Sequence, residues 1–160
     1  MKTTTTIFLH GLDSSSKGTK GIFFSTHFPK VIKPDFDGDL DNRLLQLEKI
    51  CAEKNDITFI GTSFGGLMAT CFALKFPSRV TQLILFAPAL NFKDYQVPEV
   101  MLTTETLLVI GKYDTVTPPD LVVPLAEKTF SNIKIVIEDD DHMLHNSFKL
   151  LDWNNLIGEN

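Results

Sequence analysis

Asp56-Ile57-Thr58-Phe59-Ile60-Gly61-Thr62-Ser63-Phe64-Gly65-Gly66 is the stretch that decides the fold of this chain. A short β-branched and aromatic run leads into a Gly-x-Ser-x-Gly motif, and a helical pattern follows at 67–76. This order predicts a strand, a sharp turn and a helix, with the Ser63 hydroxyl exposed at the carboxyl end of the strand. Glycines two residues before and after Ser63 lack the Cβ atoms that would clash with the neighbouring strand and helix. The alternative is a glycine-rich loop in which Ser63 only caps the helix.

The composition describes one globular domain spanning residues 1–160. The hydrophobic fraction is 43% and the mean hydropathy is +0.06, which is typical of a folded chain of this length. The net charge of -5 argues against a nucleic-acid or anionic-membrane partner. No window approaches the ~18 apolar residues of a membrane-spanning helix, and the N-terminal run is too short for a signal sequence. We therefore expect a cytoplasmic protein.

The residues with metal-binding chemistry do not form a familiar metal site. Cys51 and Cys71 stand among apolar residues at helical spacing, which favours buried thiols over a disulfide or a metal site. The acidic stretch 35–41 superficially resembles a calcium loop, but its glycine comes too early and Gln46 occupies the twelfth position. We expect Asp39 or Asp41 to cap the next helix instead. His142 and His145 lack supporting ligands at a familiar spacing. The sequence predicts no metal and no cofactor.

Short β-rich runs alternate with helical patterns along the whole chain, which predicts βαβ units and a parallel sheet. Strands are expected at 4–9, 31–34, directly before Ser63, and at 80–87, 106–110 and 133–137. Helices are expected at 20–28, after Asp39, at 67–76, from a Thr117 cap to about residue 130, and in a last segment that packs Phe148, Leu151, Trp153 and Leu156. The predicted fold is an α/β sandwich with a six-stranded parallel sheet and helices on both faces.

Three polar residues follow predicted strands. Ser63 comes after the third strand, Asp114 after the fifth and His142 after the sixth. In an open α/β sheet all three would face the same rim, where ligands bind. Ser63 would be the nucleophile. His142, with a reference pKa of about 6.5, would accept and return its proton, and Asp114 would orient the imidazole. Asp94, after the fourth strand, is the reserve candidate for the acid.

These motifs, in this chain order, resemble the α/β-hydrolase superfamily, in particular its small members with little or no cap, such as the YqiA/YcfP-like esterases. The matching pieces are His10-Gly11-Leu12-Asp13-Ser14-Ser15, Gly61-Thr62-Ser63-Phe64-Gly65-Gly66, Gly111-Lys112-Tyr113-Asp114 and Asp141-His142. The resemblance implies a three-layer α/β/α sandwich with strand order 2-1-3-4-5-6 and an acyl-transfer hydrolase for carboxylic esters or thioesters. It also implies that the backbone N–H groups of Leu12 and Phe64 form the oxyanion hole.

The sequence departs from the family pattern before the histidine, where family members often have glycine. Asp139, Asp140 and Asp141 precede His142, and nearby carboxylates favour the imidazolium form. We therefore predict an activity profile displaced to higher pH than without such neighbours. A solvated acidic loop with no such effect is an equal alternative.

The substrate pocket is less clearly marked. Candidates for its wall are His10, Phe92, Tyr95 and Met101, although core packing explains each of the last three equally well and His10 could instead pin its own loop by hydrogen bonding. The function expected from these residues is hydrolysis of a small carboxylic ester through an acyl-enzyme. A thioesterase or amidase of the same fold, or a non-catalytic interaction module, remains an alternative. The sequence identifies neither the substrate nor the oligomeric state.

Overall fold

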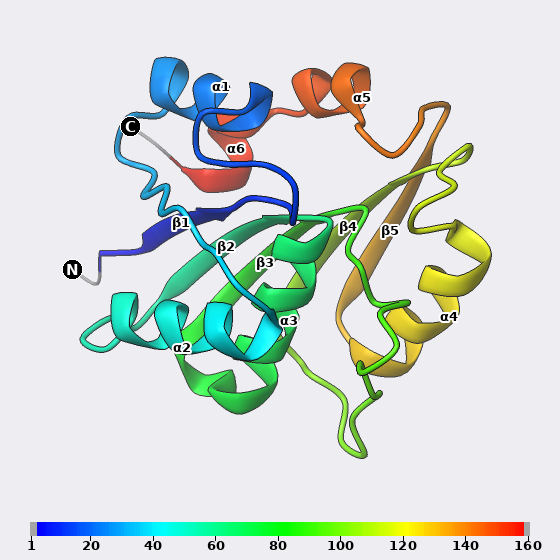
Figure 1. Ribbon diagram of the computed structural model, residues 1–160, viewed down its shortest axis with the longest axis horizontal. Helices are drawn as coiled ribbons and strands as arrows, with labels where there is room; N and C mark the ends of the chain where they lie inside the picture. The colour runs from blue at the N-terminus through cyan, green and yellow to red at the C-terminus, as the bar shows by residue number, and fades with distance from the viewer. Residues whose placement is uncertain (1–2, 159–160) are drawn as a thin grey trace.

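Five parallel strands form a single sheet in the computed structural model, which describes residues 3–158 (Figure 1). The strands follow one another across the sheet in chain order. They are β1 (Thr5–Leu9), β2 (Ile57–Thr62), β3 (Val80–Phe86), β4 (Glu105–Gly111) and β5 (Ile133–Glu138). Because the strands are parallel, all of their carboxyl ends lie along the same edge of the sheet.

The prediction of a sixth strand at 31–34 is wrong. This segment does run beside β1, on the side away from β2, but it pairs only through a single parallel bridge between Ile7 and Ile32. The Val31 N–H bonds back to Phe28 in a turn, and Pro34 has no N–H to donate to a ladder. The turn before Ile32 and the proline after it therefore limit the pairing with β1 to one bridge. Its position next to β1 is the one that the predicted strand order gives it.

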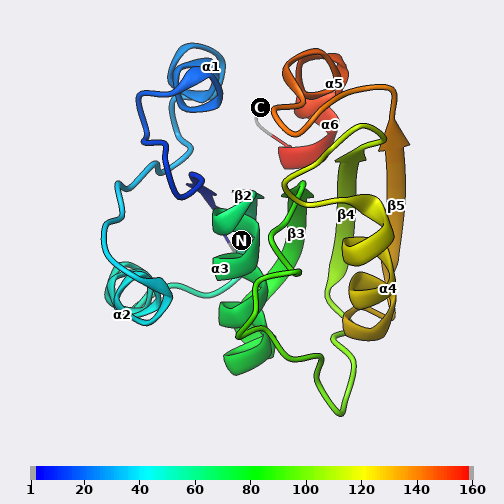
Figure 2. The same ribbon diagram turned by 45° about the vertical axis from the view of Figure 1, so that its right-hand side comes forward.

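Helices cover both faces of the sheet (Figure 2). On one face lie α1 (Thr19–His27), α5 (His145–Leu150) and α6 (Trp153–Ile157). On the other lie α2 (Leu40–Ile50), α3 (Phe64–Lys75) and α4 (Pro119–Thr129), with a 3₁₀ turn, η1 (Pro77–Arg79), after α3. The segment predicted as one last helix is thus two short helices, because Leu151 between them has an extended backbone.

Two separate apolar cores explain why the central strands are buried on both faces. Ile60, Ile84 and Phe86 pack against α1, α5 and α6 in a cluster rich in aromatic side chains. Phe59, Leu83 and Leu85 face the larger core formed with α2, α3 and α4. Because the sheet is packed on both faces, the strands are held rigidly. The loops at the carboxyl edge are therefore attached to a rigid sheet.

The predicted helix caps and thiols can be compared directly with the structure. Asp39 caps α2 by accepting a hydrogen bond from the Asn42 N–H. Thr117 does not cap α4, whose N-cap is Pro118. Cys51 and Cys71 are free thiols, the first buried and the second partly buried. Burial raises the pKa of each thiol to about 11.

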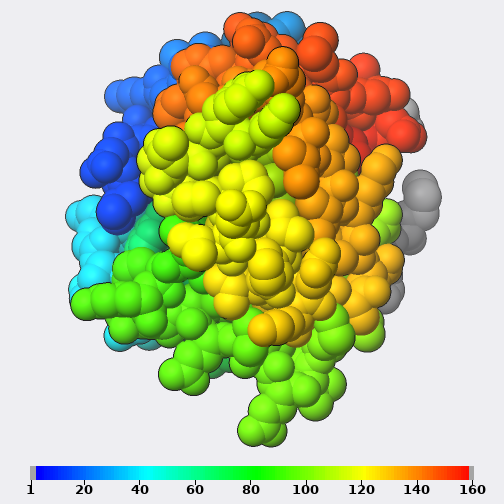
Figure 3. Space-filling view, turned by 90° about the vertical axis from the view of Figure 1, so that its right-hand side faces the viewer, coloured from blue at the N-terminus to red at the C-terminus, as the bar shows by residue number. Residues whose placement is uncertain are grey.

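The segment between β3 and β4 contains no helix or strand. Its outer part projects, in green, at the end of the molecule away from α5 in the space-filling view of Figure 3, where α4 and β5 fill the visible face. No helix within residues 3–158 has the length and hydropathy needed to cross a membrane.

Candidate active site

Ser63 lies at the turn between β2 and α3, as its motif predicts. Its backbone has φ 52° and ψ −113°, a strained conformation for a residue with a side chain. The Ser63 N–H bonds to the Phe86 carbonyl of β3, and its carbonyl accepts from Gly66, Leu67 and Ala89. These bonds hold the turn in place, so the hydroxyl projects from the carboxyl edge of the sheet.

The flanking glycines are required by close backbone contacts. A Cβ on Gly65 would lie 2.1 Å from the carbonyl oxygen of Leu9, and a Cβ on Gly61 would lie 2.6 Å from the carbonyl oxygen of Gly65. Both distances are shorter than carbon and oxygen can approach without a bond. The turn therefore closes only because both positions lack a side chain. The Ser63 side chain makes no capping hydrogen bond to α3.

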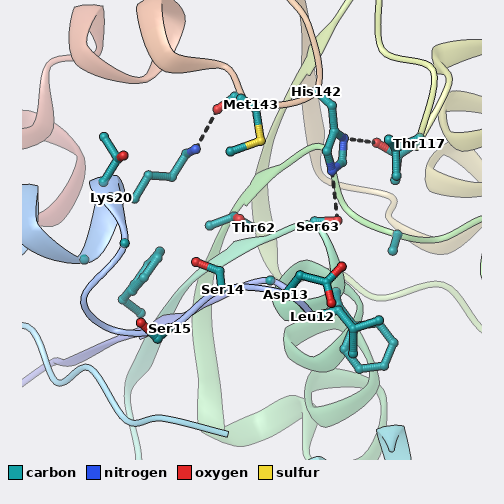
Figure 4. Close-up of a pocket in the computed structure, with 18 of the residues that line it drawn as sticks. Leu12, Asp13, Ser14, Ser15, Lys20, Thr62, Ser63, Thr117, His142 and Met143 are labelled. Atoms are coloured by element: carbon teal, nitrogen blue, oxygen red, sulfur yellow. Dashed lines mark hydrogen bonds between the residues drawn. The ribbon is translucent and has the colours of Figure 1, made fainter. Parts of the chain in front are cut away.

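The three residues that follow separate strands lie in hydrogen-bonding contact. His142 Nε2 is 3.2 Å from Ser63 Oγ, and His142 Nδ1 is 2.8 Å from Asp114 Oδ2. Figure 4 shows the His142 ring with one nitrogen directed at Ser63. The His142 side chain is 20% exposed, whereas the Asp114 side chain is completely buried. The imidazole can therefore reach a ligand, while its carboxylate partner is shielded from solvent.

The Asp114 carboxylate is held by its own loop. Oδ1 accepts hydrogen bonds from the backbone N–H groups of Val116 and Thr117. The Thr117 hydroxyl donates to Oδ2 at 2.6 Å and lies 3.2 Å from His142 Nδ1. Sequence reasoning interpreted Thr117 as a helix cap and missed this contact. Its spacing of three residues after Asp114 is the only signal that could have indicated it.

Asp94, the reserve candidate for the acid, lies on the exposed part of the segment between β3 and β4. It is Asp114, and not Asp94, that contacts His142. The structure thus brings Asp114 together with Ser63 and His142, and it leaves Asp94 at the surface.

The two backbone amides suggested for an oxyanion hole come from two different segments, the start of α3 and the loop after β1. Phe64 is the first residue of α3, where an N–H has no partner within the helix. Leu12 follows β1, the strand beside β2. Within residues 3–158, neither of these N–H groups donates to another protein group. Both remain available to a ligand.

A pocket of about 500 Å³ opens beside Ser63 and His142, within the size range of small-molecule sites. Phe92 and Phe64 line it and contact each other edge to face. Much of the remaining wall comes from the loop between β1 and α1 and from the loop after His142 (Figure 4). The lining residues that the sequence did not indicate include Asp13, Ser14, Ser15, Thr19, Lys20, Thr62, Asn91, Val116 and Met143.

Three of the four predicted pocket residues do not line this pocket. Tyr95 packs against the core, and its hydroxyl bonds to Thr129. Met101 lies at the surface, 38% exposed. His10 is buried, with Nδ1 at 2.7 Å from the Gly11 carbonyl and Nε2 accepting from the Phe36 N–H. Both nitrogens of His10 are used to hold its loop, which was the alternative interpretation.

The acidic run and Lys20 shape the loop that carries His142. Asp140 accepts hydrogen bonds from Ser147, and Asp141 accepts from the Met143 N–H. Across the pocket, the Lys20 ammonium donates to the Met143 carbonyl at 2.6 Å (Figure 4). Desolvation lowers the pKa of Lys20 below its ordinary value, and Asp140 and Asp141 partly offset this effect. Two of the three acidic residues therefore stabilise the loop itself. Whether the acidic run displaces the pH profile stays a prediction.

Potential metal ligands are dispersed in the part of the chain that the structure describes. No three His, Cys, Asp or Glu side chains gather there in a way that could hold a metal ion. The arrangement of Ser63, His142 and Asp114 instead has the form of a proton-transfer chain, from a hydroxyl to an imidazole whose far nitrogen faces a carboxylate.

Comparison with known proteins gives one match to a family model, over part of the chain. The family model described as "Serine aminopeptidase, S33" matches residues 34–108, a stretch that contains Ser63 but neither Asp114 nor His142. No curated protein sequence matches the chain at a significant level.

Three solved structures illustrate the likeness in fold. An esterase from Exiguobacterium antarcticum has a TM-score of 0.74 at 13% identity, covering 92% of this chain and 88% of its own. Est1E from Butyrivibrio proteoclasticus, solved with ferulic acid bound, has a TM-score of 0.73 at 18% identity, covering 93% and 85%. Alpha/beta hydrolase domain-containing protein 10 from mouse has a TM-score of 0.73 at 13% identity, covering 89% and 83%. At these identities the likeness concerns the fold.

Proposed function

We propose that this chain, which by its fold is a member of the α/β-hydrolase superfamily, is a serine hydrolase that cleaves a small carboxylic ester through an acyl-enzyme. The observation that carries the proposal is the contact series Ser63 Oγ–His142 Nε2, 3.2 Å, and His142 Nδ1–Asp114 Oδ2, 2.8 Å. A serine hydroxyl is a weak nucleophile unless a neighbouring base removes its proton. The contact series supplies that base and the carboxylate that orients it.

The reaction follows from these contacts. Ser63 Oγ attacks the ester carbonyl carbon as its proton moves to His142 Nε2, and the tetrahedral intermediate carries its negative charge on the former carbonyl oxygen. The N–H groups of Leu12 and Phe64 donate to that oxygen. His142 then protonates the departing alcohol. Water attacks the acyl-enzyme with His142 again as the base, which releases the acid and restores Ser63.

Asp114 acts through His142. Its carboxylate accepts a hydrogen bond from the Nδ1–H group of His142, which leaves Nε2 as the acceptor that faces Ser63. The carboxylate also stabilises the imidazolium formed during the reaction. Because Asp114 is buried and bonded to its own loop, it holds one orientation of the ring. The Thr117 hydroxyl completes the hydrogen bonding of the carboxylate.

The ester class is supported by the pocket and by the similar structures. A pocket of about 500 Å³ beside Ser63 fits a small acyl or alcohol group. One of the similar proteins is named as an esterase, and another was solved with a carboxylic acid, ferulic acid, bound. An amide substrate is the second candidate, because the matching family model is described as a serine aminopeptidase.

Turnover of p-nitrophenyl acetate by the wild type and by Ser63→Ala tests the proposal. The wild type should release nitrophenol in a Ser63-dependent reaction, with a loss on the order of 10⁶-fold in Ser63→Ala, down to the background rate. Parallel assays with a thioester and with alanine p-nitroanilide rank the leaving groups. Equal rates for the wild type and Ser63→Ala on all three substrates would reject the enzyme and favour a non-catalytic module.

A further inference from the structure

The two residues that supply the proposed oxyanion hole come from distant parts of the chain and meet at one buried side chain, Arg43 of α2. Arg43 is only 5% exposed. Its Nη2 donates to the Leu12 carbonyl at 3.3 Å, and its guanidinium carbon lies 5.4 Å from the centre of the Phe64 ring. Its Nε donates to the Gly38 carbonyl at 2.9 Å, which anchors the side chain to the start of α2.

We propose that Arg43 is a positioning residue that fixes the two oxyanion donors relative to each other. The inference rests on the proposed function, since it concerns the amides of Leu12 and Phe64. Arg43 does not line the pocket beside Ser63 and acts through the two residues that it contacts. A planar guanidinium can bond two carbonyls and stack on an aromatic face at once, which an ammonium group cannot do.

The Leu12 contact restrains a residue with few other restraints. Leu12 is 51% exposed, so packing does little to hold this residue in place. Nearby, the Ser14 N–H bonds to the Gly11 carbonyl at 3.3 Å, and His10 is held at the end of β1. The bond from Arg43 to the Leu12 carbonyl is therefore the contact that ties Leu12 itself to the rest of the fold.

The Phe64 contact restrains the other donor. Phe64 is 6% exposed, and its ring contacts both the Arg43 guanidinium and the Phe92 ring. The Phe92 contact is T-shaped, with 5.7 Å between ring centres. Phe64 is also the first residue of α3, directly after the strained turn at Ser63. Holding its ring limits rotation of the residue whose N–H faces the pocket. One guanidinium thus joins α2, the loop after β1 and the start of α3.

Stability alone gives no reason for an arginine at this place. Within residues 3–158, Arg43 Nη1 is the one buried side-chain nitrogen or oxygen without a hydrogen-bond partner. Burying a charged group with an unpaired nitrogen costs stability, which offsets part of what its two hydrogen bonds to backbone carbonyls contribute. We therefore expect Arg43→Met to keep the fold while it loosens the two donors.

Arg79 provides a matched control. It too donates from Nε and Nη2 to backbone carbonyls, those of Cys51 and Lys54, and it too stacks on aromatic rings, Phe72 and Phe76. These contacts lie at the far end of α3, away from Ser63. Arg79→Met removes the same kind of interactions without touching Leu12 or Phe64.

The experiment measures kcat and KM for p-nitrophenyl acetate, and the affinity of a trifluoromethyl ketone, whose adduct with serine carries an oxyanion. Since loss of one oxyanion donor costs about 10²–10³-fold in kcat, we expect its displacement in Arg43→Met to cost about 10- to 100-fold. The ketone should lose affinity in parallel, while KM changes by less than about threefold. Arg79→Met should keep the kcat and ketone affinity of the wild type.

Two results would overturn the inference. One is a kcat and ketone affinity for Arg43→Met within about threefold of the wild type; the other is the same loss in Arg79→Met as in Arg43→Met. If Arg43→Met does not fold, Arg43→Lys keeps the charge and most of the volume, and it should fold but show the same loss. An Arg43→Lys variant with the kcat and ketone affinity of the wild type would then reject the positioning role. Failure of the proposed function is distinguishable, because the wild type itself would show no turnover dependent on Ser63.

Discussion

The carboxylate of Asp114 contacts His142 Nδ1 with one oxygen and the backbone of the following loop with the other. Oδ2 lies 2.8 Å from the imidazole, while Oδ1 accepts from the N–H groups of Val116 and Thr117 at 2.9 and 2.8 Å. The backbone hydrogen bonds determine which carboxylate oxygen faces the ring. The loop after β4 therefore determines the orientation of the imidazole. This relationship gives the first prediction.

Asp114→Asn should reduce kcat by about 10⁴-fold. An asparagine that keeps its oxygen on the two backbone N–H groups presents its NH₂ group to His142 Nδ1. The ring must then carry its proton on Nε2, which can no longer accept the proton of Ser63. Ester turnover measures the effect, and the melting temperature is the control for folding. A variant that retains more than about a tenth of the wild-type kcat would contradict this role of Asp114.

Thr117→Val should lower kcat by about tenfold, since a hydrogen bond to a charged group is worth about 1.5–3 kcal/mol and only part of it is felt in the transition state. Valine keeps the shape of threonine but removes the hydroxyl that lies 2.6 Å from Asp114 Oδ2. Thr117→Ser is the matched control, because it keeps the hydroxyl and should remain close to the wild type. Equal losses in both variants would assign the effect to packing.

Gly65→Ala should destabilise the protein by about 3 kcal/mol or more, because a Cβ there would collide with the backbone at the end of β1. Gly11→Ala is the comparison, since the nearest atoms to its Cβ would be 3.7 Å away, and it should change the unfolding free energy by less than about 1 kcal/mol. Chemical denaturation of both variants measures the difference. Equal stabilities would mean that the turn at Ser63 is looser than described.

Cys51 and Cys71 should react slowly with a thiol reagent in the folded protein. The thiolate is the reactive form, and burial raises the pKa of both thiols to about 11. At pH 8 only about one thiol in a thousand is then ionised, against roughly one in four at an ordinary pKa of about 8.5. The reaction should accelerate as the pH rises toward 11 and on unfolding in guanidinium. Rapid labelling of the native protein at pH 8 would contradict the burial.

Features encoded by local pattern could be predicted from the sequence. The strand, turn and helix around Ser63 follow from apolar runs and paired glycines, and the Asp39 cap of α2 follows from its position before an amphipathic run. The parallel sheet follows from the alternation of strands and helices. Asp114 and His142 could be predicted as site residues because polar residues at the carboxyl ends of parallel strands face one edge of the sheet.

Features that depend on tertiary contacts could not be predicted in this way. The pattern at 31–34 is that of a strand, but a turn and Pro34 limit it to one bridge. Tyr95 and Met101 have the composition of a pocket wall, yet the pocket is built mainly from loops after β1 and β5. The contact of Thr117 with His142, and those of Arg43 with Leu12 and Phe64, join residues whose separation in the chain carries no periodic signal.

Labelling with a fluorophosphonate, followed by mass spectrometry of the modified peptide, tests the central claim most directly. The reagent phosphonylates an activated serine without requiring the natural substrate. We predict a single adduct on Ser63 in the wild type, much slower labelling in His142→Ala, and none in Ser63→Ala. An unlabelled wild type, or a His142→Ala variant labelled as fast as the wild type, would contradict the claim that His142 activates Ser63.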